Sequence, residues 1–282
     1  MNFLALCHDD VLNKLPDRNP DSHKGDYGRI LLLCGSRGYT GAAALAAMGA
    51  LRCGAGLVYL AVPESIYEIE AAKLLEPIVL PMPDQDGKFS MAAVKEICAL
   101  LPKMDAVLVG PGIGISEGSL SVVQAVLDYF EGPVVLDADG INVLQRNKDI
   151  LRGRNFPTIL TPHPGEFIRI GGNNTPDKIT GAARLATELN CIVVLKGHRT
   201  VTTDGIACYC NLTGNPGMAV GGSGDVLAGM ITALLGQGIV PLDAAAVGAW
   251  LHGAAGDLCA ADMGQYAMLP SDYLGYLPRL LK

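Results

Sequence analysis

The chain has 282 residues, of which half are hydrophobic, so it can bury a sizeable core and is not a disordered or low-complexity chain. Twenty-one basic and twenty-eight acidic side chains give a net charge of −7, the wrong sign for a surface that collects nucleic-acid phosphates. Thirty-five glycines accompany only 5% aromatic residues, so the interior has to be built from small and aliphatic side chains with close backbone approaches.

In chain order, short β-branched or Leu-rich runs alternate with Ala-rich segments that have helical spacing. This pattern predicts parallel strands joined by crossover helices, and the continuously apolar strands indicate a sheet covered on both faces. The expected strands are Arg29–Cys34, Leu57–Val62, Pro77–Leu80, Ala106–Val109, Val134–Leu136, Thr158–Leu160 and Ile192–Leu195. The expected crossover helices are Ala42–Arg52, Glu64–Leu75, Ala92–Leu101, Leu120–Phe130 and Asp177–Leu189.

The pattern changes after Lys196. Two short runs, Thr200–Thr203 and Ala207–Cys210, flank Asp204-Gly205, a pair that favours a type I′ turn and predicts an antiparallel hairpin at the sheet edge. Three helices are expected beyond it: Asp225–Leu235, Leu242–Asp262 and Ser271–Leu281. No linker-like stretch interrupts the chain, so we expect residues 1–282 to form a single three-layer α/β/α domain with a mostly parallel central sheet.

The cysteines and apolar stretches favour a soluble, cytoplasmic protein with no membrane partner. Eight cysteines without a CxxC pair, several of them in apolar runs, are typical of reduced core thiols. Cys208 and Cys210 lack the His and Cys neighbours that would complete a zinc site. The first ten residues do not resemble a signal peptide, and the longest uncharged apolar stretch falls short of the roughly 20 residues that span a bilayer.

Ligands of an open parallel sheet lie outside the carboxyl ends of its strands, so the loops after the strands are the candidate sites. The first strand runs into a glycine-spaced turn, Gly35 to Ala43, where a ligand would contact backbone, although such turns also occur as plain geometry. The loop Gly110-Pro111-Gly112-Ile113-Gly114 has Glu117 where a dinucleotide fingerprint needs its third glycine. The chain also contains no P-loop, and Gly222-Ser223-Gly224 lacks the flanking glycines of a nucleophile elbow.

Two further loops carry polar groups at strand ends. Asp137, Asp139 and Asn142 offer oxygen atoms for a substrate hydroxyl or a hydrated magnesium ion, with Asp139 as the suggested magnesium residue; capping of the next helix is the other interpretation. His163 stands between two prolines that fix its backbone, which favours a binding role over a structural one.

The most specific segment is Asn215 to Gly229, in which four glycines precede an amphipathic helix. The amides of Gly222, Ser223 and Gly224 would form an anion hole for a phosphoryl group in transfer. Asp225 falls in the first helical turn and is the candidate catalytic base; its other interpretation is a helix-start carboxylate stabilised by the dipole. We expect that dipole to lower the pKa of Asp225.

Upstream of this segment, a strand end delivers two cations and a threonine hydroxyl at Lys196, Arg199 and Thr200. The phosphates of a nucleotide would be natural partners for these groups. A solvated loop of no function has the same composition, and spacing alone does not separate the two interpretations.

With these residues in place, the sequence resembles the ADP/ATP-dependent NAD(P)H-hydrate dehydratases, a branch of the ribokinase-like superfamily. The similarity extends from about Lys24 over nearly the whole chain. Each motif alone is weak, but their combination and order are specific: Gly41-Ala42-Ala43, Gly110 to Gly114, Asp137-Ala138-Asp139, Thr161 to Glu166, Lys196-Gly197 and Asn215 to Gly229.

The resemblance implies a ribokinase-like fold and a defined reaction. The family restores NADH and NADPH from their hydrated forms, (S)-NADHX and (S)-NADPHX, by phosphorylating the added hydroxyl and eliminating phosphate. By this resemblance the substrate lies near Ala42, Gly114, His163 and Asp225, with Asp225 as the base. The donor nucleotide is expected along Lys196, Gly197, His198, Arg199 and Thr200, with Gly224. Ser223 stands where the family often has Thr, and both offer a hydroxyl.

The resemblance also implies Mg²⁺ and ADP or ATP as the phosphate donor. Bacterial-type relatives generally use ADP, but both nucleotides fit the same contacts. Relatives form tetramers, so a homo-oligomer is expected. Many relatives carry a fused N-terminal epimerase domain, for which 282 residues leave no room. We therefore expect dehydration only, in company with a separate NAD(P)HX epimerase.

Two other functions remain open from sequence. A ribokinase-like kinase for a vitamin-precursor alcohol would use the same anion hole, although Gly112-Ile113-Gly114 and the segment Thr161 to Glu166 favour the dehydratase. A nucleotide-binding regulatory module would keep the fold and use Asp225 only as a helix cap, which the surrounding glycines argue against.

Overall fold

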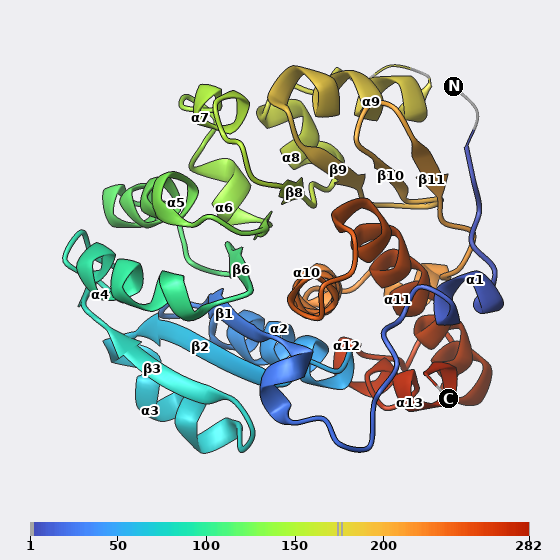
Figure 1. Ribbon diagram of the computed structural model, residues 1–282, viewed down its shortest axis with the longest axis horizontal. Coiled ribbons are helices and arrows are strands. Elements are labelled where there is room, and N and C mark those ends of the chain that lie inside the picture. The colour runs from blue at the N-terminus through green and yellow to red at the C-terminus, as the bar shows by residue number, and fades with distance from the viewer. Residues whose placement is uncertain (1–2, 174, 176, 282) are drawn as a thin grey trace.

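A computed structural model describes residues 3–173, 175 and 177–281 of the protein. A nine-stranded sheet in the order β11-β10-β9-β8-β7-β6-β1-β2-β3 runs through it (Figure 1). In this order, each strand from β3 through β2, β1, β6, β7 and β8 to β9 pairs in parallel with the next. β10 pairs antiparallel with both β9 and β11. The strands are β1 (Arg29–Leu33), β2 (Leu57–Pro63), β3 (Ile78–Met82), β6 (Ala106–Val109), β7 (Val134–Leu136), β8 (Thr158–Leu160), β9 (Ile192–Leu195), β10 (Val201–Thr203) and β11 (Cys208–Cys210). The predicted parallel sheet with an antiparallel edge is confirmed.

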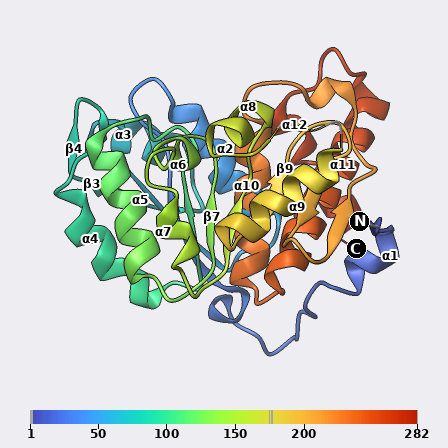
Figure 2. The same cartoon turned by 90° about the horizontal axis from the view of Figure 1, so that it is seen from above.

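Helices cover both faces of the sheet (Figure 2), and the sheet divides the hydrophobic core into two clusters. Ile30 and Leu32 of β1 face one cluster, whereas Leu31 and Leu33 face the other, as the alternation of a strand requires. The first cluster lies under α2 (Thr40–Arg52), α3 (Glu64–Lys73), α10 (Ser223–Gly236) and α11 (Pro241–Met263). The second lies under α4 (Ala93–Leu100), α5 (Glu117–Tyr129) and α9 (Lys178–Leu189). This is the expected three-layer α/β/α sandwich.

Short elements escaped the sequence analysis because they span too few residues to show a period. They are the helices α1 (His8–Leu12), α6 (Asp139–Asn142), α7 (Asp149–Arg152) and α8 (Pro164–Arg169), the hairpin of β4 (Asp84–Gln85) and β5 (Lys88–Phe89), and three 3₁₀ turns, Lys24–Tyr27, Leu101–Lys103 and Pro216–Met218. The expected C-terminal helix over residues 271–281 is wrong as one element: it is divided into α12 (Pro270–Tyr273) and α13 (Leu277–Leu280). Pro278 has no N–H to continue the helix across Gly275.

The hairpin of β10 and β11 exists, but its predicted type I′ turn is wrong. Thr203 pairs with Cys208, so four residues form the loop, and Gly205 has a positive φ of 94° whereas Asp204 does not. The Asp204 carboxylate accepts hydrogen bonds from the amides of Ile206 and Ala207, both at 2.8 Å. This side-chain turn organises a longer loop than the Asp-Gly pair alone predicts.

Both edges of the sheet are closed to further pairing. Leu4 forms a bridge to the edge strand β11: its amide donates to the Cys208 carbonyl and its carbonyl accepts from the Cys210 amide, both at 2.9 Å. At the opposite edge, β3 contains Pro81, which has no amide to donate.

The cysteines agree with the core-thiol interpretation. All eight are free, and six are buried. Across the part of the chain that the structure describes, no three His, Cys, Asp or Glu side chains form a group that would hold a metal ion. Among the same residues, none of the helices is long and apolar enough to cross a membrane.

The crossing of α2 and α10 fixes the geometry at the carboxyl edge of the sheet. A Cβ on Gly229 would come within 2.0 Å of the Ala46 carbonyl oxygen, and one on Gly49 within 2.5 Å of the Val226 carbonyl oxygen. The two backbones therefore touch through glycines, and the approach continues to Gly222, just before α10, where a Cβ would meet Leu45 of α2. The start of α10 is thus packed against α2.

Replacing Gly229 with Ala should separate these helices. We expect Gly229→Ala to lower the free energy of unfolding by about 1–3 kcal/mol, because the new methyl group overlaps the Ala46 carbonyl. Chemical denaturation measures the change. Gly153→Ala is the matched control, since a Cβ there meets nothing within 4 Å. Equal unfolding midpoints for the two variants would contradict the proposed contact.

Candidate active site

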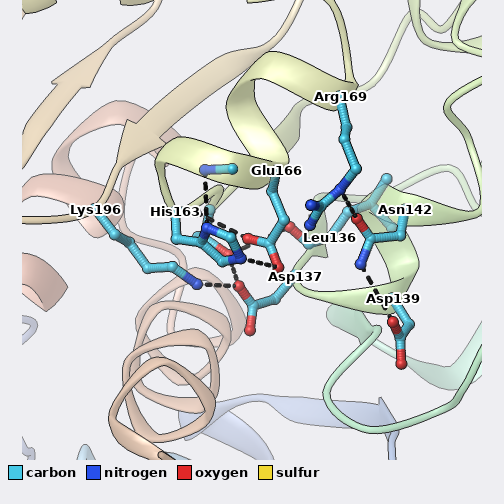
Figure 3. Close-up of polar contacts among 10 residues, drawn as sticks. Leu136, Asp137, Asp139, Asn142, His163, Glu166, Arg169 and Lys196 are labelled. Atoms are coloured by element: carbon cyan, nitrogen blue, oxygen red, sulfur yellow. Dashed lines mark hydrogen bonds and ion pairs between the residues drawn. The ribbon is translucent and has the colours of Figure 1, made fainter. Parts of the chain in front are cut away.

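A buried ion pair lies at the centre of the site (Figure 3). Nζ of Lys196, which follows β9, lies 2.6 Å from Oδ1 of Asp137, which follows β7, and the hydroxyl of Thr161, after β8, donates to the same oxygen at 2.7 Å. Burial lowers the pKa of Lys196, but the carboxylates of Asp137 and Glu166 outweigh burial and leave that pKa raised. Lys196 therefore stays an ammonium group, held by Asp137 while it faces the start of α10.

Asp225, in the first turn of α10, has an elevated pKa. Burial and the charge of Asp137 raise the pKa of Asp225 to about 6, and Lys196 offsets this only in part. The expectation that the helix dipole would lower this pKa is wrong, because loss of solvent and repulsion between carboxylates exceed the dipole's effect. A carboxylate that titrates near 6 is a better proton acceptor than an exposed aspartate.

The loop before α10 presents hydrogen-bond donors beside Lys196. Gly222 has a φ of 96°, which favours glycine, and turns the chain into the helix. The amides of Gly222, Gly224 and Asp225 donate to no main-chain carbonyl of the described residues, whereas the Ser223 amide donates to the Val220 carbonyl at 3.3 Å. The Ser223 amide is therefore engaged within the loop, and the amides of Gly222 and Gly224 are the ones available to the expected anion hole. A Cβ on Gly224 would come within 3.0 Å of Nζ of Lys196, so the ammonium group borders the free amides.

His163 is held by its own turn at the start of α8. Its Nδ1 accepts from the Gly165 amide at 2.9 Å, and its Nε2 lies 3.3 Å from Oε1 of Glu166. Oε2 of Glu166 accepts from the His163 amide at 2.8 Å, which completes a capping box. Because both ring nitrogens are engaged and half of the side chain is exposed, the ring face and edge are what His163 presents to a ligand.

A chain of hydrogen bonds fixes the loop after β6. The Gly114 amide donates to Oδ2 of Asp139 at 3.0 Å. The Asn142 side chain donates to Oδ1 of Asp139 at 3.2 Å (Figure 3). Nε of Arg169 donates to Oδ1 of Asn142 at 2.9 Å. Asp139 and Asn142 therefore tie neighbouring loops together, and both oxygens of the suggested magnesium residue Asp139 are engaged in doing so.

The glycine turn after β1 is bound to the same loop. The Gly35 amide donates to the Pro111 carbonyl at 2.7 Å, and the Ser36 hydroxyl donates to the Gly112 carbonyl at 2.6 Å. A Cβ on Gly112 would come within 2.9 Å of the Ala42 Cβ, so Ala42 lies against this loop. The expected substrate residues Ala42, in the first turn of α2, and Gly114, in the loop after β6, therefore lie on adjoining segments at one sheet edge.

The expected nucleotide residues after Lys196 form an exposed loop, which a lysine of α9 holds through two main-chain carbonyls. Nζ of Lys178, in α9, donates to the carbonyl oxygens of His198 at 3.2 Å and Arg199 at 3.1 Å. The Thr200 hydroxyl donates to the Gly197 carbonyl at 3.0 Å. Arg199 has a left-handed φ of 54° and makes no ion pair with any described residue, so its guanidinium is available to an anion.

Sequence reasoning missed the supports of the site. It did not name Arg169 and Lys178, because a single basic residue inside a helix carries no pattern. It quoted Asp137 without recognising its pairing with Lys196, 59 positions away. Long-range pairs of this kind follow from the sheet order and not from spacing.

The comparisons with known proteins agree with this site. The family model for NAD(P)H-hydrate dehydratase matches residues 30–279. The chain is 43% identical over 277 residues to a bifunctional NAD(P)H-hydrate repair enzyme of Moorella thermoacetica, covering 96% of this chain and 52% of that protein. It is 36% identical to an ADP-dependent (S)-NAD(P)H-hydrate dehydratase of Cenarchaeum symbiosum, covering 98% of this chain and 96% of that one. The chain thus spans about half the length of bifunctional relatives and nearly all of a monofunctional one.

Solved structures give the same result. The ADP/ATP-dependent NAD(P)H-hydrate dehydratase of Bacillus subtilis, co-crystallised with ATP and Mg²⁺, superposes with a TM-score of 0.86 at 33% identity, covering 99% of this chain and 98% of that chain. Ribokinase of Thermotoga maritima, at 16% identity and a TM-score of 0.54 over 89% of this chain and 99% of its own, shares the fold alone. The fold is ribokinase-like, and the chain belongs to the NAD(P)H-hydrate dehydratase family.

Proposed function

We propose that the protein dehydrates (S)-NADHX and (S)-NADPHX to NADH and NADPH, with ADP or ATP as the phosphate donor. One observation carries the proposal: a carboxylate with a pKa of about 6, Asp225, borders the amides of the anion hole and the ammonium group of Lys196. The names of the Cenarchaeum and Bacillus relatives support the choice of substrate and donor.

The chemistry replaces a poor leaving group with a good one. The terminal phosphoryl group of the nucleotide moves to the ring hydroxyl oxygen, and the hydroxyl proton passes to Asp225. The lone pair of the ring nitrogen then expels phosphate, and loss of a proton from the adjacent ring carbon restores the double bond. Oxidation states are unchanged overall. Positioning and charge stabilisation contribute most to such a phosphoryl transfer.

Each loop has a part in this reaction. The amides of Gly222 and Gly224 and the Ser223 hydroxyl would bind oxygen atoms of the phosphoryl group in transfer. The hydrated ring would lie against Ala42, Gly114 and the ring of His163. The nucleotide would follow Gly197, His198, Arg199 and Thr200, with the Arg199 guanidinium as an available cation.

Magnesium fits this site as a companion of the nucleotide. The described residues offer no preformed cluster of three acidic or imidazole ligands, so phosphate oxygens and waters would complete most of the octahedral shell. Asp137 and Asp225 are the carboxylates beside the anion hole that would contact the ion or its waters. When bound, the ion neutralises charge on the phosphates.

We also propose a single ribokinase-like domain in the cytoplasm that works beside a separate NAD(P)HX epimerase. The free, mostly buried thiols support a reducing compartment. Assembly into a homotetramer rests on the resemblance. Most of α11 packs inside the chain's own core, and large apolar side chains are left exposed near its ends at Val240, Met263, Tyr266 and Leu269.

The role of Asp225 predicts a large loss on its replacement. Asp225→Asn should lower kcat by about 10²–10⁴-fold, because the amide cannot accept the hydroxyl proton, while nucleotide binding persists. Recovery of NADH absorbance from (S)-NADHX measures turnover, and calorimetry with ATP and Mg²⁺ measures binding. Asp149→Asn, the same change in the exposed first turn of α7, should leave both unchanged. Undiminished turnover in Asp225→Asn would remove the proposed base.

The raised pKa of Asp225 also predicts opposite effects of pH on activity and stability. Activity should rise with pH through about 6, because the base must be ionised. The folded pKa lies above the unfolded one, so ionisation destabilises the folded state. The free energy of unfolding of Asp225→Asn should therefore exceed that of the wild type by about 3 kcal/mol at pH 8 and by nothing at pH 3. Denaturation curves at both pH values test the sign, and a gain that is equal at pH 3 would contradict it.

The choice of substrate distinguishes the proposed dehydratase from the alternative, a kinase for a vitamin-precursor alcohol. We expect turnover of (S)-NADHX and no phosphorylation of a panel of vitamin-precursor alcohols with the same nucleotide. A coupled assay for phosphate release and mass spectrometry of the alcohols make the comparison. Activity confined to the alcohols would overturn the proposed function.

A further inference from the structure

Two polar side chains that the reaction scheme does not use, those of Tyr273 and His252, meet the hydroxyl of Ser223 at the start of α10. The hydroxyl of Tyr273, the last residue of α12, donates to Oγ of Ser223 at 2.9 Å. Nε2 of His252, in the middle of α11, lies 3.5 Å from the same oxygen. The His252 and Tyr273 rings meet edge to face, with centroids 5.3 Å apart and planes at 85°. Three helices thus converge on one hydroxyl group.

Burying the polar atoms of Tyr273 and His252 costs free energy of folding, which suggests that these side chains have a role other than filling space. Tyr273 is 2% exposed and His252 is 9% exposed. The neighbours of His252 in the buried part of α11 are mainly Ala, Gly and aliphatic residues, where a leucine would fill space without burying polar atoms. Burial lowers the pKa of His252 to about 4, so the imidazole is neutral at physiological pH.

The contacts of the Ser223 hydroxyl limit where its own hydrogen atom can be donated. Because Tyr273 donates to Ser223, one lone pair of Oγ is occupied, and the hydroxyl hydrogen of Ser223 has to point elsewhere. The His252 nitrogen is a weak competitor, since 3.5 Å is at the outer limit of a hydrogen bond. Ser223 is the first residue of α10 and stands in the chain between Gly222 and Gly224, whose amides donate to no main-chain carbonyl of the described residues.

We infer that Tyr273 is a positioning residue, which fixes the hydroxyl of Ser223 so that its hydrogen is donated to the phosphoryl group in transfer. The inference rests on the proposed function of this site and extends it from the glycine loop to the C-terminal helices. His252 packs against the Tyr273 ring, and its Nε2 lies at the outer limit of hydrogen-bond distance from Oγ of Ser223. Ser223 is then a catalytic residue through its side chain.

Four variants test the inference: Tyr273→Phe, Ser223→Ala, the double variant, and Ser223→Thr combined with Tyr273→Phe. With (S)-NADHX, ATP and Mg²⁺, Tyr273→Phe should lower kcat about three- to tenfold and leave the KM of (S)-NADHX unchanged, because one hydrogen bond in the transition state is misdirected. In the Ser223→Ala background the same change should have no further effect. With Thr at 223, which keeps the hydroxyl, the loss should reappear.

Tyr276→Phe is the matched control, since this tyrosine lies three residues further on, under the Arg279 guanidinium and away from the anion hole. An equal loss from Tyr273→Phe with Ser or Ala at 223, or a loss of the same size in Tyr276→Phe, would overturn the inference, because Tyr273 would then act by packing alone.

A binding measurement, which does not require turnover, tests the positioning role of Tyr273 separately from the proposed dehydratase function. Inactivity of the wild type toward (S)-NADHX would refute the proposed function by itself. Calorimetric binding of ATP with Mg²⁺ still tests Tyr273: its replacement should weaken binding about two- to fivefold with Ser at 223 and not with Ala. Equal weakening in both backgrounds, or none in either, would refute the positioning role.

Discussion

The site depends on one ammonium group that is shared among several carboxylates. Lys196 pairs with Asp137, and the charges of Glu166 and Asp225 also act on its pKa. Burial raises the pKa values of Glu166 and Asp225, the charge of Asp137 raises them further, and Lys196 offsets this only in part. An incoming nucleotide adds further negative charge. In the proposed reaction this arrangement would favour the uptake of a proton by Asp225, and Mg²⁺ would have an electrostatic role beyond holding phosphates.

Around this ion pair, the loops at the sheet edge are fixed by contacts with one another. Asp139 holds the Gly114 amide, Ser36 holds the Gly112 carbonyl, and Lys178 holds two carbonyls of the nucleotide loop. These contacts leave glycine backbone exposed to the ligands while its position is set from behind. Such preorganisation is what a phosphoryl transfer needs, because geometry contributes more than covalent chemistry does.

The sequence predicted the sheet, the crossover helices and the segment around Asp225, because these depend on local periodicity and on glycine spacing. It was wrong about the pKa of Asp225, which depends on burial and on Asp137, a residue 88 positions earlier in the chain. It missed Tyr273 and His252 because their partnership with Ser223 exists only after three helices have packed. The Asp204 turn shows the same limit at short range, since one side-chain oxygen outweighed the preference of the Asp-Gly pair.

The closed edges of the sheet restrict how copies of this chain associate. A strand of another molecule would have to displace Leu4 from β11, or pair with β3 where Pro81 interrupts the row of donors. Both devices protect proteins against edge-to-edge aggregation. A continuous intermolecular sheet is therefore disfavoured, and subunit contacts in an oligomer have to come from helices and loops, whose side chains are free to change between homologues without altering the strands that carry the site.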